Sequence, residues 1–298
     1  MISAVVTVYN EEQVVPELVR RLETTLVLWG DAYEILFVDD GSNDKTSCVI
    51  EKARDKNKHI KLLQFSRNFG QVAALRAGLS YAQGDIVVTM DGDLQDLPEE
   101  IPLLIEKLHE GFDIVYAQRE QRKHSFFRNL SSLIVAYVLR WAMARGGVVP
   151  LDKQTLVLGV FRAMRREVID ACNDLSEQTG YFQGLVNWVG FSHAIVPVMH
   201  GARVAGRSHY TLRKLFRYGL EAIVFLFPFP LRIFMFIGIA IAAISLPLMI
   251  ITTRLFFFAL SFWAGIQIAA LGVLGEYICR SLLETKRRPL YVIRKKLL

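Results

Sequence analysis

The sequence predicts an α/β fold with a mostly parallel, Rossmann-like sheet that carries helices on both faces, followed by a membrane-associated C-terminal region. Two observations predict it. Short apolar runs alternate with helical patterns through about the first 200 residues, which is typical of parallel sheets covered on both sides. Two uncharged runs, 233–253 and 255–275, are separated by a single arginine. At ~1.5 Å per residue, a helix over either run spans a hydrocarbon core of about 30 Å.

The composition agrees with this division. The chain has 298 residues, of which 52% are hydrophobic, and a mean hydropathy of +0.30, which is high for an ordinary cytosolic enzyme. Its net charge of +6 indicates attraction to a membrane surface, because the basic residues cluster around the apolar runs; no nucleic-acid partner is expected. The three cysteines are far apart and fit neither a disulfide framework nor a metal knuckle, in agreement with a reducing compartment.

The soluble part reads as an ordered series of strands and helices. Strands are expected over 2–8, 33–38, 60–65, 85–90 and 114–117, and helices over 14–28, 45–55, 71–82 and 98–110. In parallel sheets, ligands bind beyond the carboxyl ends of the strands. Four of the expected strands end in a polar cluster, at 9–12, 39–42, 66–70 and 91–93. These clusters predict a nucleotide site at that edge, although neither a G-x-G-x-x-G nor a Walker A motif is present.

Asp91, Gly92 and Asp93 directly follow the apolar run 86–90 and form the most informative motif of the chain. Side chains alternate along a strand, so the two carboxylates are expected to point the same way, with Gly92 allowing a ligand to approach between them. Converging carboxylates repel each other unless a proton or a cation lies between them. Such oxygen ligands suit Mg²⁺ or Mn²⁺. A lone D-x-D is more often a surface turn, and the preceding strand is what favours a metal site here.

The C-terminal third predicts an interfacial helix and a transmembrane hairpin. Residues 210–230 are amphipathic and are expected to lie in the membrane interface, with an ordinary packed helix as the alternative. Helices over 231–253 and 255–279 would form the hairpin around Arg254, and 280–298 would be a basic cytoplasmic tail. A buried hairpin in the protein core is the alternative. Because basic residues flank the spans and the turn holds only one, both termini are expected in the cytoplasm.

Taken in order, the polar strand ends resemble the motifs of family-2 glycosyltransferases, which have the GT-A fold. The resemblance rests on VVTVYNEE at 5–12, FVDDGSNDKT at 37–46 and MDGDLQD at 90–96. Within that family the chain is similar to the polyprenyl-phosphate branch, which includes dolichol-phosphate mannose synthases and bacterial bactoprenol-phosphate glycosyltransferases. The narrower likeness rests on SRNFG at 66–70, GLVNWVG at 184–190, LGVLGEY at 271–277 and RPLY at 288–291.

This resemblance implies roles for the residues at the strand ends. Asp91 and Asp93 would bind Mg²⁺ or Mn²⁺ and, with Gln95, form the catalytic group. The residues implied for the donor nucleotide, with Asp39 or Asp40 on its uracil or ribose, are Tyr9, Asn10, Glu11, Asp39, Asp40 and Arg67. Two of them have simpler explanations: Asp40 could cap a turn, and Glu11 could be a charge in the first turn of a helix.

The resemblance also implies a site for a lipid phosphate. Guanidinium groups suit phosphate oxygens, and the residues at the acceptor positions of relatives are Arg119, Arg128, Ser132 and Arg207. Arg128 could instead be an interfacial anchor. In the loop that closes over the site in relatives, this chain has His209 where family members often carry lysine, so the charge there would depend on pH.

One position departs from the family pattern. Relatives carry an acidic residue before the phenylalanine of a D-F-R-L segment, and this chain has Val160 there. A phosphate monoester has a second pKa near 6, so at neutral pH it is largely a dianion and needs little help from a general base. Alignment and metal stabilisation of the leaving diphosphate would lower the barrier. We therefore expect an active enzyme.

Together these expectations describe an inverting membrane glycosyltransferase that moves a sugar from a nucleotide-sugar, expected to be a UDP-sugar, to undecaprenyl or dolichyl phosphate. The lipid-linked monosaccharide would serve cell-surface glycan modification, such as O-antigen modification of lipopolysaccharide. One alternative is a processive polysaccharide synthase, disfavoured because Arg140-Trp141 lacks the glutamine of a Q-x-x-R-W motif. Another is a non-catalytic membrane scaffold, whose only support is Val160.

The expected location is the bacterial inner membrane, with a catalytic domain over 1–209 in the cytoplasm. The expected partners are the nucleotide-sugar donor, the polyprenyl phosphate acceptor and the bilayer. The resemblance adds a homo-oligomer, a tetramer in relatives, together with a downstream flippase and a second transferase.

Overall fold

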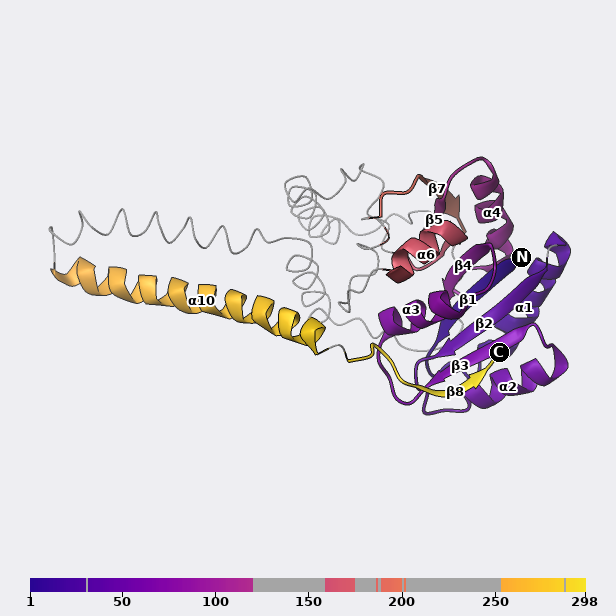
Figure 1. Cartoon of the computed structure of the whole chain (residues 1–298), viewed down its shortest axis with the longest axis horizontal. Coiled ribbons are helices and arrows are strands. Elements are labelled where there is room, and N and C mark those ends of the chain that lie inside the picture. The colour runs from indigo at the N-terminus through magenta and orange to yellow at the C-terminus, as the bar shows by residue number, and fades with distance from the viewer. Residues whose placement is uncertain are drawn as a thin grey trace. The chain divides into compact units, whose positions relative to one another are not determined.

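The computed structural model describes residues 1–30, 32–119, 159–174, 186, 189–199, 201, 253–286 and 288–298. The chain divides into two compact units (Figure 1). One contains Met1–Ser132, Leu151–Tyr210 and Pro289–Leu298, and the other contains Leu133–Pro150 and Thr211–Arg288.

The described part of the first unit is an α/β structure. Its strands are β1 (Ile2–Val8), β2 (Tyr33–Asp39), β3 (Ile60–Phe65), β4 (Ile86–Asp91), β5 (Ile114–Arg119), β6 (Arg162–Arg165), β7 (His193–Val198) and β8 (Ile293–Leu297). Its helices are α1 (Val15–Trp29), α2 (Thr46–Lys56), α3 (Gln71–Tyr81), the short 3-10 helix η1 (Pro98–Glu100), α4 (Ile101–His109) and α6 (Arg166–Asp174). The elements expected before residue 120 are therefore present, with ends that differ by one or two residues.

The strands form one sheet in the order β7-β5-β6-β4-β1-β2-β3-β8. Strand β1 pairs in parallel with both β2 and β4, β2 with β3, and β5 with β7. Strands β6 and β8 are antiparallel to their neighbours. The prediction of a mostly parallel sheet is confirmed. After β3 the chain crosses back to place β4 on the other side of β1, so the topological switch point, where open α/β sheets bind ligands, lies between β1 and β4.

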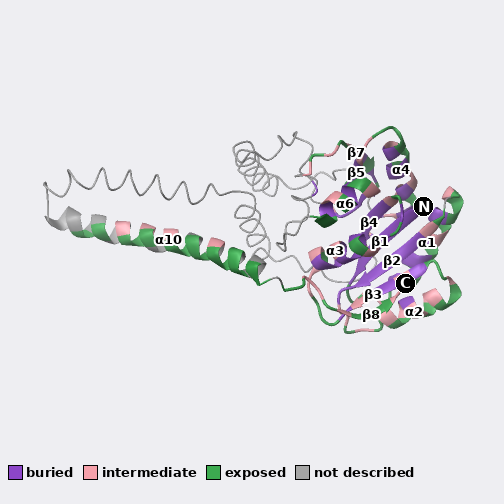
Figure 2. Ribbon diagram, viewed as in Figure 1, coloured by how far each residue is buried: buried purple, intermediate pink, exposed green. Residues whose placement is uncertain are grey.

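Helices cover both faces of this sheet. Alternate residues of β1 face opposite sides, so Val6 joins a core with Leu22 of α1 and Leu104 of α4, whereas Val5 joins a separate core with Leu75 of α3 and Ile169 of α6. Figure 2 shows the strands buried and the outer faces of the helices exposed. The sheet is thus fixed from both sides, which holds its carboxyl edge rigid.

Strand β6 and helix α6 were not anticipated from the sequence. The strand is only four residues long and contains two arginines, so it has no apolar run. Arg165 donates hydrogen bonds to the carbonyl oxygens of Leu108 and Phe112, at 2.7 and 3.0 Å. Arg166 donates to the carbonyls of Ala82 and Gly84. These cations satisfy carbonyls at or just beyond the ends of α4 and α3, where a helix dipole favours positive charge.

Strand β8 was also not anticipated, and neither was β7. Strand β8 lies within residues predicted to be a basic tail. It pairs with β3 at the edge of the sheet, and the Tyr291 ring just before it stacks on Phe65 at 5.0 Å between centroids. The Lys295 ammonium lies 2.7 Å from a Glu51 carboxylate oxygen. The tail therefore ends as part of the first unit.

The described part of the second unit is one helix, α10 (Thr253–Thr285). It begins one residue before Arg254 and contains the predicted second span, 255–279, and none of its described side chains is buried. Judged on the residues that the structure describes, no helix is long and apolar enough to cross a membrane. The predicted interfacial segment, 210–230, and all but the last residue of the predicted first span, 231–253, lie outside the described residues.

Candidate functional site

The candidate site lies where three parallel strands end side by side. In the sheet register, Asp91 at the end of β4 lies beside Thr7 of β1, and Asp39 at the end of β2 lies beside Val8. The carboxylates predicted from the second and fourth strands therefore flank the same strand, at the switch point of the sheet.

The Asp91 carboxylate is strongly perturbed by its surroundings. Its Oδ1 accepts hydrogen bonds from Gln71 Nε2 at 2.6 Å and from Thr7 Oγ1 at 3.3 Å. Desolvation by the surrounding protein, reinforced by the negative charges of Asp96 and Asp93, raises its pKa to about 7. The two hydrogen bonds only partly offset this effect. A carboxylate in this state favours binding a proton or a cation.

Asp93 lies on a turn and not on the strand, because β4 ends at Asp91. The expected alternation of side chains therefore does not apply to this pair. Leu94 has a φ of 59°, an unusual value for a non-glycine residue, and is buried in the core. Gln95 holds the Asp93 carboxylate through its backbone N–H at 3.1 Å and its side-chain Nε2 at 2.6 Å. The Gln95 carbonyl in turn accepts a hydrogen bond from the Gly201 backbone at 3.0 Å.

Gly92 is required for a packing reason that the sequence did not reveal. A Cβ at this position would lie 2.5 Å from Val8 Cγ1, far inside van der Waals contact. The glycine thus allows β1 to approach the turn closely, and its role in making room for a ligand stays a prediction.

The donor set at this edge fits a hard divalent cation. Asp91 and Asp93 supply oxygen ligands only, and the raised pKa of Asp91 reports negative charge that a cation would neutralise. Within the described part of the chain, no group of three His, Cys, Asp or Glu side chains is placed to enclose a metal.

Asp39 is fully buried at the end of β2. Its Oδ1 accepts a hydrogen bond from the Ser42 backbone at 2.9 Å, and its Oδ2 lies 3.4 Å from Gln64 Nε2. Desolvation raises its pKa. The Oδ2 contact is long and therefore weak.

Asp40 supports the loop that precedes α3. Its carboxylate accepts hydrogen bonds from the backbone N–H groups of Phe69, at 2.7 Å, and Gly70, at 2.9 Å. Gly41, with a φ of 68°, lets this turn lie against the Arg67 backbone, where a Cβ would come within 2.3 Å. Desolvation raises the pKa of Asp40. These contacts are with backbone groups 29 and 30 positions along the chain, so they differ from the local turn cap considered from the sequence.

The loops after β1 and β2 are joined by reciprocal hydrogen bonds. The Asn10 backbone donates to Ser42 Oγ, and the Asn43 backbone donates to Asn10 Oδ1, both at 2.9 Å. The Lys45 backbone donates to Glu12 Oε2 at 2.9 Å. Asn10 adopts a φ of 56°, which directs the chain away from the sheet. These contacts form a rigid rim at the edge of the site. The Asn10 side-chain oxygen already accepts a hydrogen bond within this rim.

Three other residues predicted to bind the donor lie on or near this rim. The Glu11 backbone donates to Thr46 Oγ1 at 2.9 Å, which fixes the start of α1 against α2. Tyr9 follows β1 with 38% of its surface exposed, so its ring is available for stacking. Arg67 lies over the Phe69 ring at 4.0 Å and leaves its charge exposed.

The predicted acceptor residues are less completely described. Arg119 is the last residue of β5, where it pairs with Val198 of β7. Arg128, Ser132 and Arg207 lie outside the described residues, as does His209. Val160 is described, and its side chain belongs to the apolar core around α3 and α6, while its carbonyl accepts a 2.6 Å hydrogen bond from Thr89.

Sequence reasoning missed three residues around Asp91: Thr7, Gln71 and Asp96. Thr7 and Gln71 donate to its carboxylate, and buried Asp96 accepts a long hydrogen bond from its backbone at 3.5 Å. Gln71 directly follows the polar cluster 66–70, and this position in the sequence was the one sign that it could lie near the site. Its orientation toward Asp91 depends on the fold and could not be derived from spacing.

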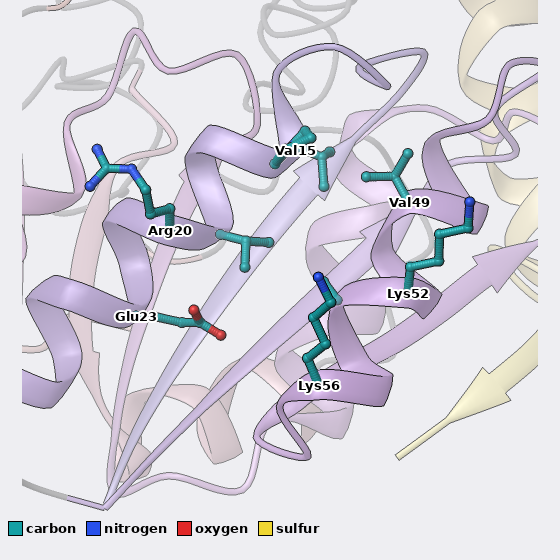
Figure 3. A pocket seen from close by; sticks show the side chains of 9 residues that line it. Val15, Arg20, Glu23, Val49, Lys52 and Lys56 are labelled. Carbon is teal, nitrogen blue, oxygen red and sulfur yellow. The ribbon is translucent and has the colours of Figure 1, made fainter.

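A separate groove lies between α1 and α2, with a cavity volume of about 330 Å³. Figure 3 shows Arg20 and Glu23 on one side and Lys52 and Lys56 on the other. None of the predicted donor, metal or acceptor residues lines it, so it lies outside the candidate site.

The sequence is similar to known glycosyltransferases over nearly its whole length. Residues 3–172 match the family model described as glycosyl transferase family 2. An uncharacterized glycosyltransferase of Bacillus subtilis (strain 168), YkcC, is 36% identical over 306 residues, covering 98% of this chain and 93% of that protein. The undecaprenyl-phosphate 4-deoxy-4-formamido-L-arabinose transferase of Klebsiella pneumoniae (strain 342) is 34% identical over 310 residues, covering 99% and 93%.

Solved structures show the same fold. The glucosyl-3-phosphoglycerate synthase of Mycobacterium tuberculosis, crystallised with Mn²⁺ and UDP-glucose, superposes with a TM-score of 0.52 and 21% identity, over 75% of this chain and 77% of that one. Its complex with Mn²⁺, UDP and phosphoglyceric acid gives a TM-score of 0.53. At this identity the likeness concerns the fold alone.

Proposed function

Because the chain belongs to glycosyl transferase family 2, we propose that it transfers a sugar from a nucleotide-sugar, a UDP-sugar by its motifs, to polyprenyl phosphate at a membrane. The observation that carries the proposal is Asp91, a desolvated carboxylate beside Asp93 at the switch point of the sheet. The nearly full-length similarity to a transferase named for undecaprenyl phosphate supports the lipid acceptor.

Asp91 and Asp93 would hold Mg²⁺ or Mn²⁺. When bound, the ion supplies positive charge to the diphosphate of the donor. Gln95 holds Asp93 in place through two hydrogen bonds. The exposed ring of Tyr9 would stack on the base, and Asp39 would accept a hydrogen bond from the nucleotide. Arg67 adds an exposed cation on the same rim.

The transfer itself requires little proton chemistry. An oxygen of the acceptor phosphate forms a bond to the anomeric carbon while the bond from that carbon to the diphosphate breaks, and the nucleotide diphosphate leaves with the electron pair. Since a phosphate monoester is largely a dianion at neutral pH, no side chain has to remove a proton from it. The apolar surroundings of Val160 agree with this scheme, because a buried valine cannot act as a base.

The lipid acceptor requires a membrane-bound enzyme. We propose the interfacial segment over 210–230 and the helical hairpin over 231–253 and 255–279 as the membrane region, with Arg119, Arg128, Ser132 and Arg207 as the acceptor group. An amphipathic segment beside the catalytic unit would hold the active site near the headgroups, where the phosphate of the acceptor lies.

The direct test is an assay of the purified full-length chain in detergent with polyprenyl phosphate, Mn²⁺ and a panel of radiolabelled nucleotide-sugars that includes the UDP-sugars. We expect label from one donor to move into an organic-extractable monosaccharide lipid, with release of UDP. Excess EDTA, or the Asp93→Ala substitution, should abolish the transfer. Label in a polymer would indicate a processive synthase. No transfer from any nucleotide-sugar would indicate a non-catalytic scaffold.

A further inference from the structure

We propose that Gln71 is a positioning residue for the metal-binding carboxylate Asp91, an inference that rests on the proposed function. Gln71 is the first residue of α3, and its side-chain Nε2 lies 2.6 Å from Asp91 Oδ1. The two residues are twenty positions apart, and the fold brings them together. No role in the reaction follows for Gln71 from the motifs of the sequence.

The geometry leaves one oxygen of Asp91 for a ligand. Thr7 Oγ1 also donates to Oδ1, at 3.3 Å, so both donors reach the same oxygen. Among the hydrogen bonds of the described residues, none reaches Oδ2. Two donors on Oδ1, one from β1 and one from α3, fix the plane of the carboxylate. Oδ2 is then the oxygen that would bind a cation.

Gln71 is itself held by a rigid support. Asp40 accepts hydrogen bonds from the Phe69 and Gly70 backbones, directly before α3 begins. The Phe69 ring packs edge-on against Phe65, with 5.7 Å between centroids. The amide of Gln71 is therefore presented to Asp91 from a fixed point of the backbone, which is the arrangement that lowers the cost of orienting a ligand.

The second carboxylate is also held by a glutamine amide, although both of its oxygens accept a hydrogen bond. Gln95 Nε2 donates to Asp93 Oδ2 at 2.6 Å, as Gln71 Nε2 donates to Asp91 Oδ1. A neutral amide suits this task because it orients the carboxylate without neutralising it. A lysine or arginine in its place would compete with the metal for the negative charge.

Direct metal binding tests the inference without relying on activity. Mn²⁺ binding to the full-length protein without nucleotide would be followed by the electron paramagnetic resonance signal of free Mn²⁺. Gln71→Leu removes the donor at similar size, and Gln71→Met does so with a good helix former, in case the leucine variant folds poorly. Gln13→Leu is the matched control, because Gln13 is exposed on the loop after β1 and has no role in the site.

We expect the dissociation constant for Mn²⁺ to rise about tenfold to a hundredfold in the Gln71 variants and to stay at the wild-type value in Gln13→Leu. The Mn²⁺ concentration for half-maximal activity should rise by the same factor. Wild-type affinity in a folded Gln71 variant would overturn the inference and leave the proposed function intact. Absence of Mn²⁺ binding in the wild-type protein would overturn the proposed metal site and the inference with it.

Discussion

At the scale of single residues, Asp91 is placed for function at the expense of stability. Its pKa is raised to about 7, against an ordinary value of 3.8, so the folded metal-free protein binds this proton more tightly than the unfolded chain does. The destabilisation is absent below the unfolded pKa, grows as the pH rises through the range between the two values, and is complete above about 7. Active sites often contain such groups.

Asp91→Asn should therefore stabilise the metal-free protein while it abolishes transfer. The asparagine keeps an oxygen that can accept from Gln71 and Thr7, and it removes the charge. We expect the free energy of unfolding to rise by about 1–3 kcal/mol at pH 8 and to change little at pH 4. Thermal melts of both proteins in EDTA at the two pH values measure this difference. An equal change at both pH values would mean that charge is not the cause.

At the scale of elements, β8 fastens the end of the chain to the sheet. The Ser66 backbone donates to the Val292 carbonyl at 2.9 Å, just before β8, and Ser66 begins the loop that leads to Gln71. The stacked pair of Phe65 and Tyr291, with planes 8° apart, lies at the same point. This segment thus supports the loop that orients Asp91.

Tyr291→Ala should lower the free energy of unfolding of the catalytic unit by about 1–2 kcal/mol, since it removes a half-buried ring and its stacking contact with Phe65. For a unit of this size, the melting temperature should fall by about 2–8 °C. Val292→Ala is the control, because that side chain is exposed and its backbone contact is kept. Differential scanning fluorimetry of the full-length proteins compares them. Equal effects of the two substitutions would show that the stacked ring contributes little.

The elements also show what the sequence could and could not predict. Strands β1 to β5 follow from apolar runs that a buried parallel sheet requires, and their polar ends follow from the topology. Strands β6 and β8 are short antiparallel strands that contain basic residues. They have no apolar run, so hydropathy does not reveal them. The positions of Asp39 and Asp91 at one edge were predictable, but the hydrogen bond from Gln71 depends on where α3 begins relative to β4. The start of α3 relative to β4 is set by the packing of the whole fold, which sequence spacing does not reveal.

At the scale of the whole molecule, the pairing of β8 with β3 constrains the topology of the proposed membrane region. Met1 lies at the start of β1 and Leu298 follows β8, and both strands belong to one sheet. A folded sheet cannot be divided by a bilayer, because the hydrocarbon core offers no partners for its backbone groups. If the proposed membrane region between β1 and β8 spans the bilayer, it must therefore cross it an even number of times. The distribution of basic residues independently predicts that both ends of the chain lie on the same side of the membrane.

Cysteine labelling can test whether both ends of the chain lie on one side of the membrane and the turn of the hairpin on the other. A cysteine at Thr253, where α10 begins beside Arg254, should react with a membrane-impermeant maleimide in intact cells, after the native cysteines have been replaced by serine. A cysteine at exposed Lys58, in the loop before β3, and one added after Leu298 should react only after permeabilisation. The physical reason is that the turn of a two-helix hairpin must lie across the membrane from a sheet that contains both ends of the chain. If the cysteine after Leu298 reacted from outside while Lys58→Cys did not, β8 would be separated from β3 by the bilayer. The sheet order and the hairpin could not then both hold.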